Sequence, residues 1–131
     1  MEKIHANVLV IGSGTAGSNA ARAASKVGAE KVILVQPREL INTCVEEGCM
    51  PSKSILAGGH RHLPLTQVLE ERDAHIDRLK NALVEGLSSE AFEIILGTAE
   101  FVDDHTVTVT DGEAKQDYSA DSIVIATGSH P

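Results

Sequence analysis

The sequence is nearly free of aromatic residues. It has one Tyr, two Phe and no Trp among 131 residues, so its hydrophobic 42% is almost wholly aliphatic. A core built from these residues must rest on Val, Ile, Leu and Ala rather than on stacked rings. The hydrophobic fraction also argues against intrinsic disorder, which combines high charge with low hydrophobicity.

Cysteine and cationic residues are scarce as well. Two Cys are too few for the disulfide framework of a small secreted domain. The chain has 11 Lys and Arg against 19 Asp and Glu, for a net charge of −8. This balance disfavours nucleic-acid partners, because binding to phosphates relies on many cations.

Long hydrophobic runs are also missing. The run from Val8 to Ile11 is far shorter than the roughly 20 residues that cross a membrane, and it is too short for a secretory signal. We therefore expect a cytoplasmic protein without a membrane partner. A length of 131 residues suits one domain.

The apolar patterns predict an α/β fold. Residues 4–11 become continuously apolar before Gly12, and residues 31–35 repeat the pattern, as buried strands do. The Ala-rich residues 15–27 between them predict a helix that ends at Gly28. A strand, a helix and a strand in about 30 residues form a βαβ unit with parallel strands.

The remaining patterns predict helices and then strands. We expect a short helix over 51–57 and a loop over 58–64. Residues 66–87 have the strongest amphipathic pattern, and Thr66 is the expected cap of that helix. Strands are predicted over 93–96, 106–110 and 122–126, with a hairpin turn at Asp111-Gly112.

A glycine motif follows the first predicted strand directly. Gly12, Gly14 and Gly17 fit G-x-G-x-x-G at the start of a helix, which is the context of a dinucleotide cradle. The first glycine permits the tight turn, the second a close approach of pyrophosphate, and the third helix–strand packing. The helix N-terminus adds free N–H groups. Gln36 stands where an acidic residue usually binds a ribose hydroxyl, and its amide can hydrogen-bond that group.

A second motif contains both cysteines. Four residues separate Cys44 from Cys49. In a straight α-helix, positions five apart have Cα atoms about 8–9 Å apart, whereas a disulfide needs about 4.4–6.8 Å. A disulfide here requires a loop or a distorted helix start, which Gly48 permits. So short a closed loop adds little stability, which favours a redox role in a reducing compartment.

Two other interpretations of the cysteines stay open. They could be buried structural residues, or they could bind zinc together with His60 and His62. Zinc sites usually use closer cysteines and four ligands, so we expect no metal.

Charged neighbours bear on the reactivity of the cysteines. A helix start and Lys53 should lower a thiol pKa and so favour the reactive thiolate. Glu46 and Glu47, which lie between the cysteines, should raise the thiol pKa and oppose negatively charged substrates.

A dinucleotide cradle followed by C-x-x-x-x-C-x-P-S-K resembles one family, the flavin-dependent pyridine nucleotide–disulfide oxidoreductases. Residues 126–131, ATGSHP, are similar to its A-T-G-S-x-P segment, and residues 97–101, GTAEF, to its G-x-A-x-F strand start. The resemblance implies a Rossmann-like FAD/NAD(P)-binding domain, with a parallel sheet, a long helix and a small antiparallel β-meander, that is incomplete here. We expect residues 1–131 to be the FAD-binding domain, the N-terminal portion of a longer parent chain. A dihydrolipoamide dehydrogenase-like enzyme is the first expectation.

The resemblance also implies roles for individual residues. Cys49 would face the flavin, and Cys44 would attack the substrate disulfide. Electrons would pass from NAD(P)H through FAD to the Cys44–Cys49 disulfide, and then to a small-molecule or protein-bound disulfide. The implied cofactor-binding residues are Gly12, Gly14, Ala16, Gly17, Gln36, Thr43, Lys53, Ala99, Ala126, Thr127 and Gly128.

By the same resemblance, the parent enzyme is a homodimer. The 131 residues alone should be catalytically incomplete, because they contain no second G-x-G-x-x-G for NAD(P)H. Two alternatives stay open. One is a non-catalytic nucleotide-binding or interaction module that keeps the fold, and the other is an NAD-binding dehydrogenase domain.

Overall fold

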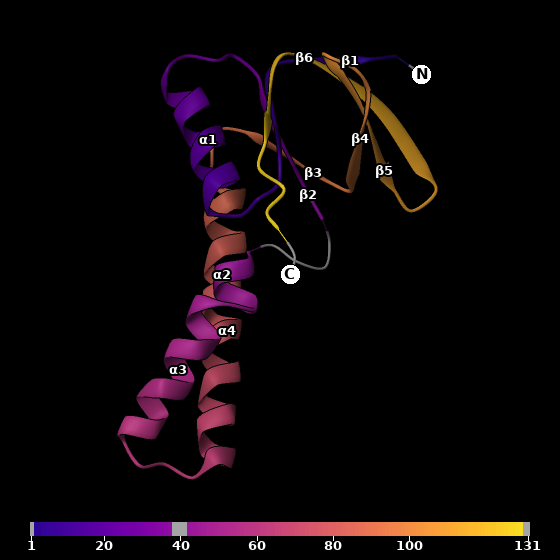
Figure 1. Cartoon of the computed structure of the whole chain (residues 1–131). Helices are drawn as coiled ribbons and strands as arrows, with labels where there is room; N and C mark the ends of the chain where they lie inside the picture. The colour runs from indigo at the N-terminus through magenta and orange to yellow at the C-terminus, as the bar shows by residue number, and fades with distance from the viewer. Residues whose placement is uncertain (1, 38–41, 130–131) are drawn as a thin grey trace. The chain divides into compact units, whose positions relative to one another are not determined.

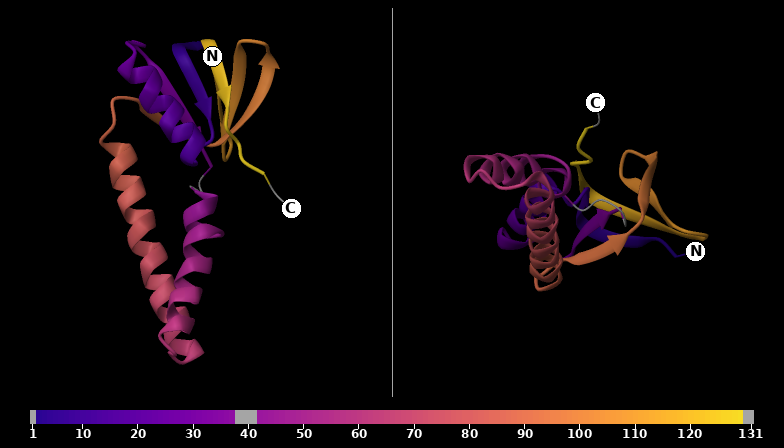
Figure 2. Two further views of the ribbon diagram at one scale, coloured as in Figure 1. Left: turned by 60° about the vertical axis from the view of Figure 1, so that its left-hand side comes forward. Right: turned by 90° about the horizontal axis from the view of Figure 1, so that it is seen from below.

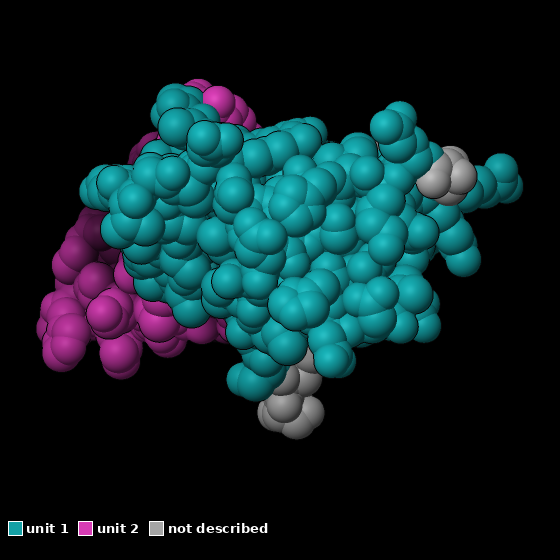
Figure 3. Space-filling model, turned by 90° about the horizontal axis from the view of Figure 1, so that it is seen from above, with its two compact units in different colours: residues 1–41, 89–131 teal, residues 42–88 magenta. Residues whose placement is uncertain are grey.

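A computed structural model of the chain describes residues 2–37 and 42–129. The chain divides into two compact units, residues 1–41 with 89–131 and residues 42–88 (Figure 3). In the described part, the first unit holds the sheet and one helix, and the second is helical.

The first unit is built on a six-stranded sheet with the order β3-β2-β1-β6-β5-β4 (Figure 1). β1 pairs in parallel with β2 and β6, and β2 with β3, whereas β4, β5 and β6 pair antiparallel. The predicted α/β fold, a parallel sheet joined to an antiparallel meander, is confirmed. The strands are β1 (Ile4–Ile11), β2 (Val32–Gln36), β3 (Glu93–Leu96), β4 (Thr98–Asp103), β5 (Thr106–Asp111) and β6 (Ala114–Ile125).

The long strand β6 joins the two parts of the sheet. Its residues 114–119 pair with β5, and its residues 118–125 pair with β1. The sequence predicted a strand only over 122–126, because the polar first half of β6 lacks the apolar run of a buried strand. The predicted hairpin turn before β6 is confirmed, and Gly112 takes a positive φ of 61° there.

Aliphatic side chains form the core of this unit. Leu9, Ile33 and Val35 of the parallel strands cluster with Val107 and Val109 of β5, and all are buried. Because side chains alternate along a strand, their neighbours in the sequence face the opposite side. β1 and β2 are therefore buried on both faces, which is why they have continuous apolar runs.

Helix α1 (Thr15–Lys26) packs on β1 and β2. It lies along the parallel strands in Figures 1 and 2. Its small residues permit this contact, since Gly17 is buried and Ala21 is fully so. The helix ends as predicted, with a positive φ of 99° at Gly28.

The second unit comprises α2 (Thr43–Glu46), α3 (Cys49–His60) and α4 (Leu65–Ser88). α3 and α4 pack side by side (Figure 2). The amphipathic helix is confirmed, but Thr66 as its cap is wrong. The helix already begins at Leu65, and the Val68 amide donates to the Pro64 carbonyl at 3.0 Å. Within the described residues, no helix is long and apolar enough to cross a membrane.

α3 is longer than the sequence predicted. The expected loop over 58–64 is shorter, because α3 continues through Gly58 and Gly59 to His60. Gly58 is buried against Val68 of α4. Close packing between the helices therefore outweighs the low helix propensity of glycine.

Replacing Gly58 with Ala should destabilise this unit by about 1–3 kcal/mol, the usual cost of overpacking. A Cβ at Gly58 would lie 2.6 and 2.8 Å from the two methyl carbons of Val68. Gly59→Ala is the matched control, because no atom lies within 4 Å of its Cβ position. It should stabilise the helix by up to about 1 kcal/mol. Urea unfolding followed by circular dichroism measures both, and equal effects would contradict this packing.

Candidate functional site

The glycine loop after β1 leaves no room for side chains at two of its positions. A Cβ at Gly12 would overlap the carbonyl oxygen of Ala126, and Gly12 has a positive φ of 108°. A Cβ at Gly17 would overlap the carbonyl oxygen of Gly12. The loop is therefore pressed between α1 and the end of β6, as the motif predicts.

Gly14 differs from these two glycines. It is the N-cap of α1, has a φ of −59°, and has no atom within 4 Å of its Cβ position. No acidic residue lies in the first turn of α1, and Ala16 is exposed there. The protein itself therefore does not require glycine at position 14. A glycine at this position suits a ligand that approaches the backbone.

Main-chain hydrogen bonds bring the ends of the strands together around this loop. The Gly12 amide donates to the Val35 carbonyl, and the Ala126 amide donates to the Ile11 carbonyl, both at 2.8 Å. The Gly97 amide donates to the Gln36 carbonyl at 2.9 Å. The carboxyl ends of parallel strands form the usual ligand-binding edge of an open α/β sheet.

The side chain of Gln36 is buried, and its oxygen lacks a hydrogen-bond partner among the described residues. Gln36 is 9% exposed, and its Oε1 has no hydrogen-bond partner among the described residues. Buried polar atoms nearly always have a partner, so an orphaned acceptor calls for an explanation. Oε1 could accept a hydrogen bond from a ribose hydroxyl, which fits the role predicted for this residue.

A cavity of about 190 Å³ lies at this edge. Three predicted cofactor residues, Gly12, Ala99 and Thr127, line it together with the end of β2. Ala126 is half-buried, while Thr127 and Gly128 are exposed after β6. His130 and Pro131 of the last motif lie outside the described residues.

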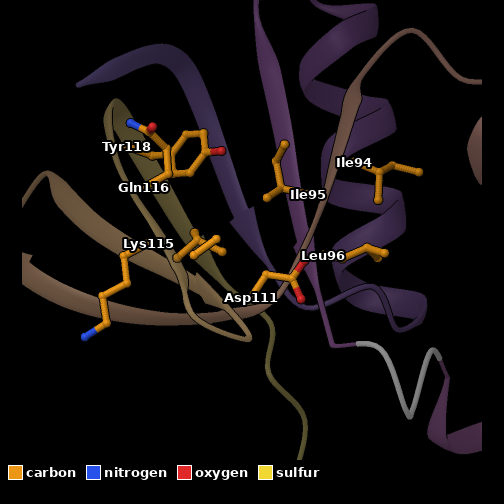
Figure 4. A pocket seen from close by; sticks show the side chains of 9 residues that line it. Ile94, Ile95, Leu96, Asp111, Lys115, Gln116 and Tyr118 are labelled. Atoms are coloured by element: carbon orange, nitrogen blue, oxygen red, sulfur yellow. The ribbon is translucent and has the colours of Figure 1, made fainter. Parts of the chain in front are cut away.

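A larger cavity of about 550 Å³ lies between β3 and the β5–β6 hairpin (Figure 4). The ring of Tyr118 points toward Ile95 there. Burial, with a smaller contribution from the Glu93 carboxylate, raises the pKa of Tyr118 above its ordinary value. None of the predicted cofactor residues lines this cavity, so the smaller cavity at the glycine loop is the candidate site.

The cysteines lie in the second unit, where they form a disulfide. Their Cα atoms are 4.8 Å apart, which a straight helix would not allow. α2 ends at Glu46, and α3 begins at Cys49 with Gly48 as its N-cap. The cysteines therefore lie on either side of a helix break, in agreement with the predicted loop or distorted helix start. Cys44 is half-buried and Cys49 is exposed, so neither is a fully buried structural cysteine.

The other residues predicted beside the cysteines are exposed. Thr43 is the first residue of α2, and Lys53 lies one turn into α3. Lys53 forms no ion pair with any described residue. No group of three His, Cys, Asp or Glu that could hold a metal ion occurs in residues 2–37 and 42–129.

One contact of the redox segment, by which we mean residues 44–49, was not predicted from the sequence. Lys80 of α4 forms an ion pair with Glu46 at 2.8 Å, although the two residues are far apart in the chain. Helical periodicity places Lys80 on α4 but says nothing of the helix that it meets, so no sequence pattern pointed to this pair.

Comparisons with known proteins agree with this arrangement. The model of the pyridine nucleotide-disulphide oxidoreductase family matches residues 6–131. The chain is 31% identical to dihydrolipoyl dehydrogenase of Geobacillus stearothermophilus, over 98% of this chain and 31% of that protein. It is 29% identical to soluble pyridine nucleotide transhydrogenase of Vibrio vulnificus (strain YJ016), over 97% of this chain and 31% of that protein.

A solved structure shows the same fold. It is a Cu(II) complex of the HOCl-induced flavoprotein disulfide reductase RclA from Escherichia coli, with a TM-score of 0.86 and 26% identity over 98% of this chain and 29% of that one. The chain thus spans less than a third of the length of these relatives. Homologues in the family use FAD and NAD(P)H. The matches establish that the chain belongs to the pyridine nucleotide-disulphide oxidoreductase family.

Proposed function

We propose that residues 1–131 are the N-terminal, FAD-binding portion of an enzyme that reduces disulfides with electrons from NAD(P)H. One observation carries this proposal. A dinucleotide cradle with an orphaned hydrogen-bond acceptor occurs in the same chain as a solvent-accessible disulfide at a helix start. The two together are what a flavoprotein disulfide oxidoreductase requires.

The glycine loop would hold the pyrophosphate of FAD, since the free N–H groups of the first turn of α1 favour an anion. Gln36 would accept a hydrogen bond from the adenosine ribose through Oε1. Thr43 and Lys53 would contact the phosphate and flavin regions. The full proposed set is Gly12, Gly14, Ala16, Gly17, Gln36, Thr43, Lys53, Ala99, Ala126, Thr127 and Gly128.

Bound FAD would supply the two-electron link between NAD(P)H and the cysteines. In the reduced protein, the Cys44 thiolate attacks the substrate disulfide, and a mixed disulfide forms as the first thiol leaves. The Cys49 thiolate then attacks Cys44 Sγ, which restores the Cys44–Cys49 disulfide and releases the second thiol. The substrate gains the two electrons that the cysteine pair loses.

The substrate is a small-molecule or protein-bound disulfide, and lipoamide, the disulfide form of dihydrolipoamide, is the first candidate. We place the enzyme in the cytoplasm as a homodimer. The cytoplasm suits a disulfide with a catalytic role, because reducing compartments rarely retain structural disulfides.

Ligand binding by the purified protein tests this proposal. Flavin absorbance that persists through gel filtration, or saturable uptake of FAD by apoprotein, is the expected result. Saturable binding of NAD⁺ without FAD would support an NAD-binding dehydrogenase domain instead. Binding of neither nucleotide to folded protein would support a non-catalytic module.

Replacing Gln36 with Leu should weaken FAD binding about tenfold, because one hydrogen bond to the ribose is lost. The stability of the apoprotein should not fall, since the variant removes a buried oxygen that has no partner among the described residues. Gln67→Leu on the exposed face of α4 is the control and should bind FAD normally. Fluorescence titration measures the affinities, and an unchanged affinity in Gln36→Leu would contradict the assignment.

A further inference from the structure

The two carboxylates between the cysteines have different environments. Both oxygens of Glu46 are engaged, since Oε2 lies 2.8 Å from Lys80 Nζ and Oε1 accepts from the Asn42 amide at 3.1 Å. The side chain of Glu46 is only 11% exposed. Its charge is therefore held against a cation, away from bulk water.

Glu47 has the opposite environment. It is exposed and forms no ion pair with any described residue. It is the C-cap of α2, three residues after Cys44 and two before Cys49. Its carboxylate is therefore free to act on the charge of an approaching substrate.

Other charges lie near the cysteines, and they do not depend on the ion pair between Glu46 and Lys80. Lys53 is exposed one turn into α3, and the N-terminus of that helix carries a partial positive charge. Both favour a thiolate at Cys49. Because neither contacts Glu46 or Lys80 by any described hydrogen bond or ion pair, changes at these two residues can be measured against a constant background.

We propose that Lys80 neutralises Glu46, so that Glu47 alone makes the redox segment select cationic and neutral disulfides over anionic ones. This inference rests on the proposed disulfide reduction at Cys44 and Cys49. It differs from the expectation that both carboxylates oppose anionic substrates. Lys80 and Glu46 are positioning residues, and Glu47 is the specificity residue.

Thiol–disulfide exchange by the reduced chain tests the inference without flavin. The protein is reduced with a phosphine, freed of it, and mixed with cystamine, hydroxyethyl disulfide or dithiodiglycolate, which are cationic, neutral and anionic. Loss of protein thiols gives the rate constants. The measured quantity is the cationic-to-anionic rate ratio, which a merely structural role would leave unchanged.

The variants should change this ratio in opposite directions. Lys80→Met removes the cation that faces Glu46. It should change the rate with each charged probe about two- to threefold in opposite directions, the effect of one charge roughly 8 Å away in water, and so raise the ratio about four- to ninefold. Glu46→Gln and Glu47→Gln should each lower it by a similar factor. The double variant Lys80→Met/Glu46→Gln should return to the wild-type ratio. Glu70→Gln, a matched charge change on α4, should leave it unchanged.

Salt provides a second criterion. At about 1 M salt the Debye length is about 3 Å, so the differences between variants should vanish. An unchanged ratio in folded Lys80→Met at low salt, or a double variant that behaves like either single one, would overturn the inference. Failure of the reduced wild-type chain to react with any of the three probes would instead contradict the proposed redox role of the cysteines.

Discussion

Replacing Gly14 with Ala should weaken FAD binding at least about tenfold, a loss of about 1.4 kcal/mol or more, and leave the protein as stable as before. No protein atom lies within 4 Å of the new Cβ, and the φ of −59° suits alanine. The added methyl group would instead occupy the path by which pyrophosphate approaches the backbone. Flavin fluorescence titration and thermal unfolding of the apoprotein measure the two effects separately.

Gly12→Ala is the matched comparison. A Cβ there would overlap the Ala126 carbonyl, and the positive φ of 108° is strained for alanine. This variant should lose about 1–2 kcal/mol or more of stability, even without ligand. If Gly14→Ala unfolds as Gly12→Ala does, or binds FAD like the wild type, then glycine at position 14 does not serve the approach of the ligand.

Replacing either cysteine with Ser should reduce disulfide reduction to background, since Cys44 attacks the substrate disulfide and Cys49 then resolves the mixed disulfide. The two variants should differ in their spectra. Cys44→Ser keeps the Cys49 thiolate and should retain long-wavelength charge-transfer absorbance with bound flavin. Cys49→Ser should lose it. Spectra of the FAD-loaded enzyme after partial reduction by dithionite measure the difference.

The wild type is the reference for this experiment, because its oxidised disulfide holds no thiolate. The absorbance should therefore appear in the wild type only after reduction. If Cys49→Ser retains the absorbance while Cys44→Ser lacks it, the roles of the cysteines are reversed. If neither the wild type nor Cys44→Ser shows it, no thiolate contacts the flavin.

Local pattern predicted the parts of the fold that depend on near neighbours. The apolar runs before Gly12 and in residues 31–35 identified β1 and β2, respectively, because both faces of these strands are buried. The glycine motif predicted the tight loop after β1, because Gly12 and Gly17 each lie where the backbone leaves no room for a side chain. Disulfide geometry predicted a loop or a distorted helix start at the cysteines, and the chain has a helix break there, but the short helix α2 was not predicted.

Contacts between residues that are far apart in the sequence could not be predicted from local sequence patterns. The extension of α3 through Gly58 depends on Val68 of α4, which no propensity scale contains. The orphaned oxygen of Gln36 depends on how the sheet packs around it. The Lys80–Glu46 pair likewise needs the packed helices, and it changes the expected charge of the redox segment.

Coupling of bound flavin to the Cys44–Cys49 disulfide within one protein can be measured by counting electrons. The FAD-loaded enzyme is titrated with dithionite under anaerobic conditions until the flavin is fully reduced. The wild type should take up twice as many electrons as flavin alone, because the disulfide is itself a two-electron couple, and Cys44→Ser should halve this uptake. Uptake by the oxidised wild type that equals that of flavin alone would contradict the account.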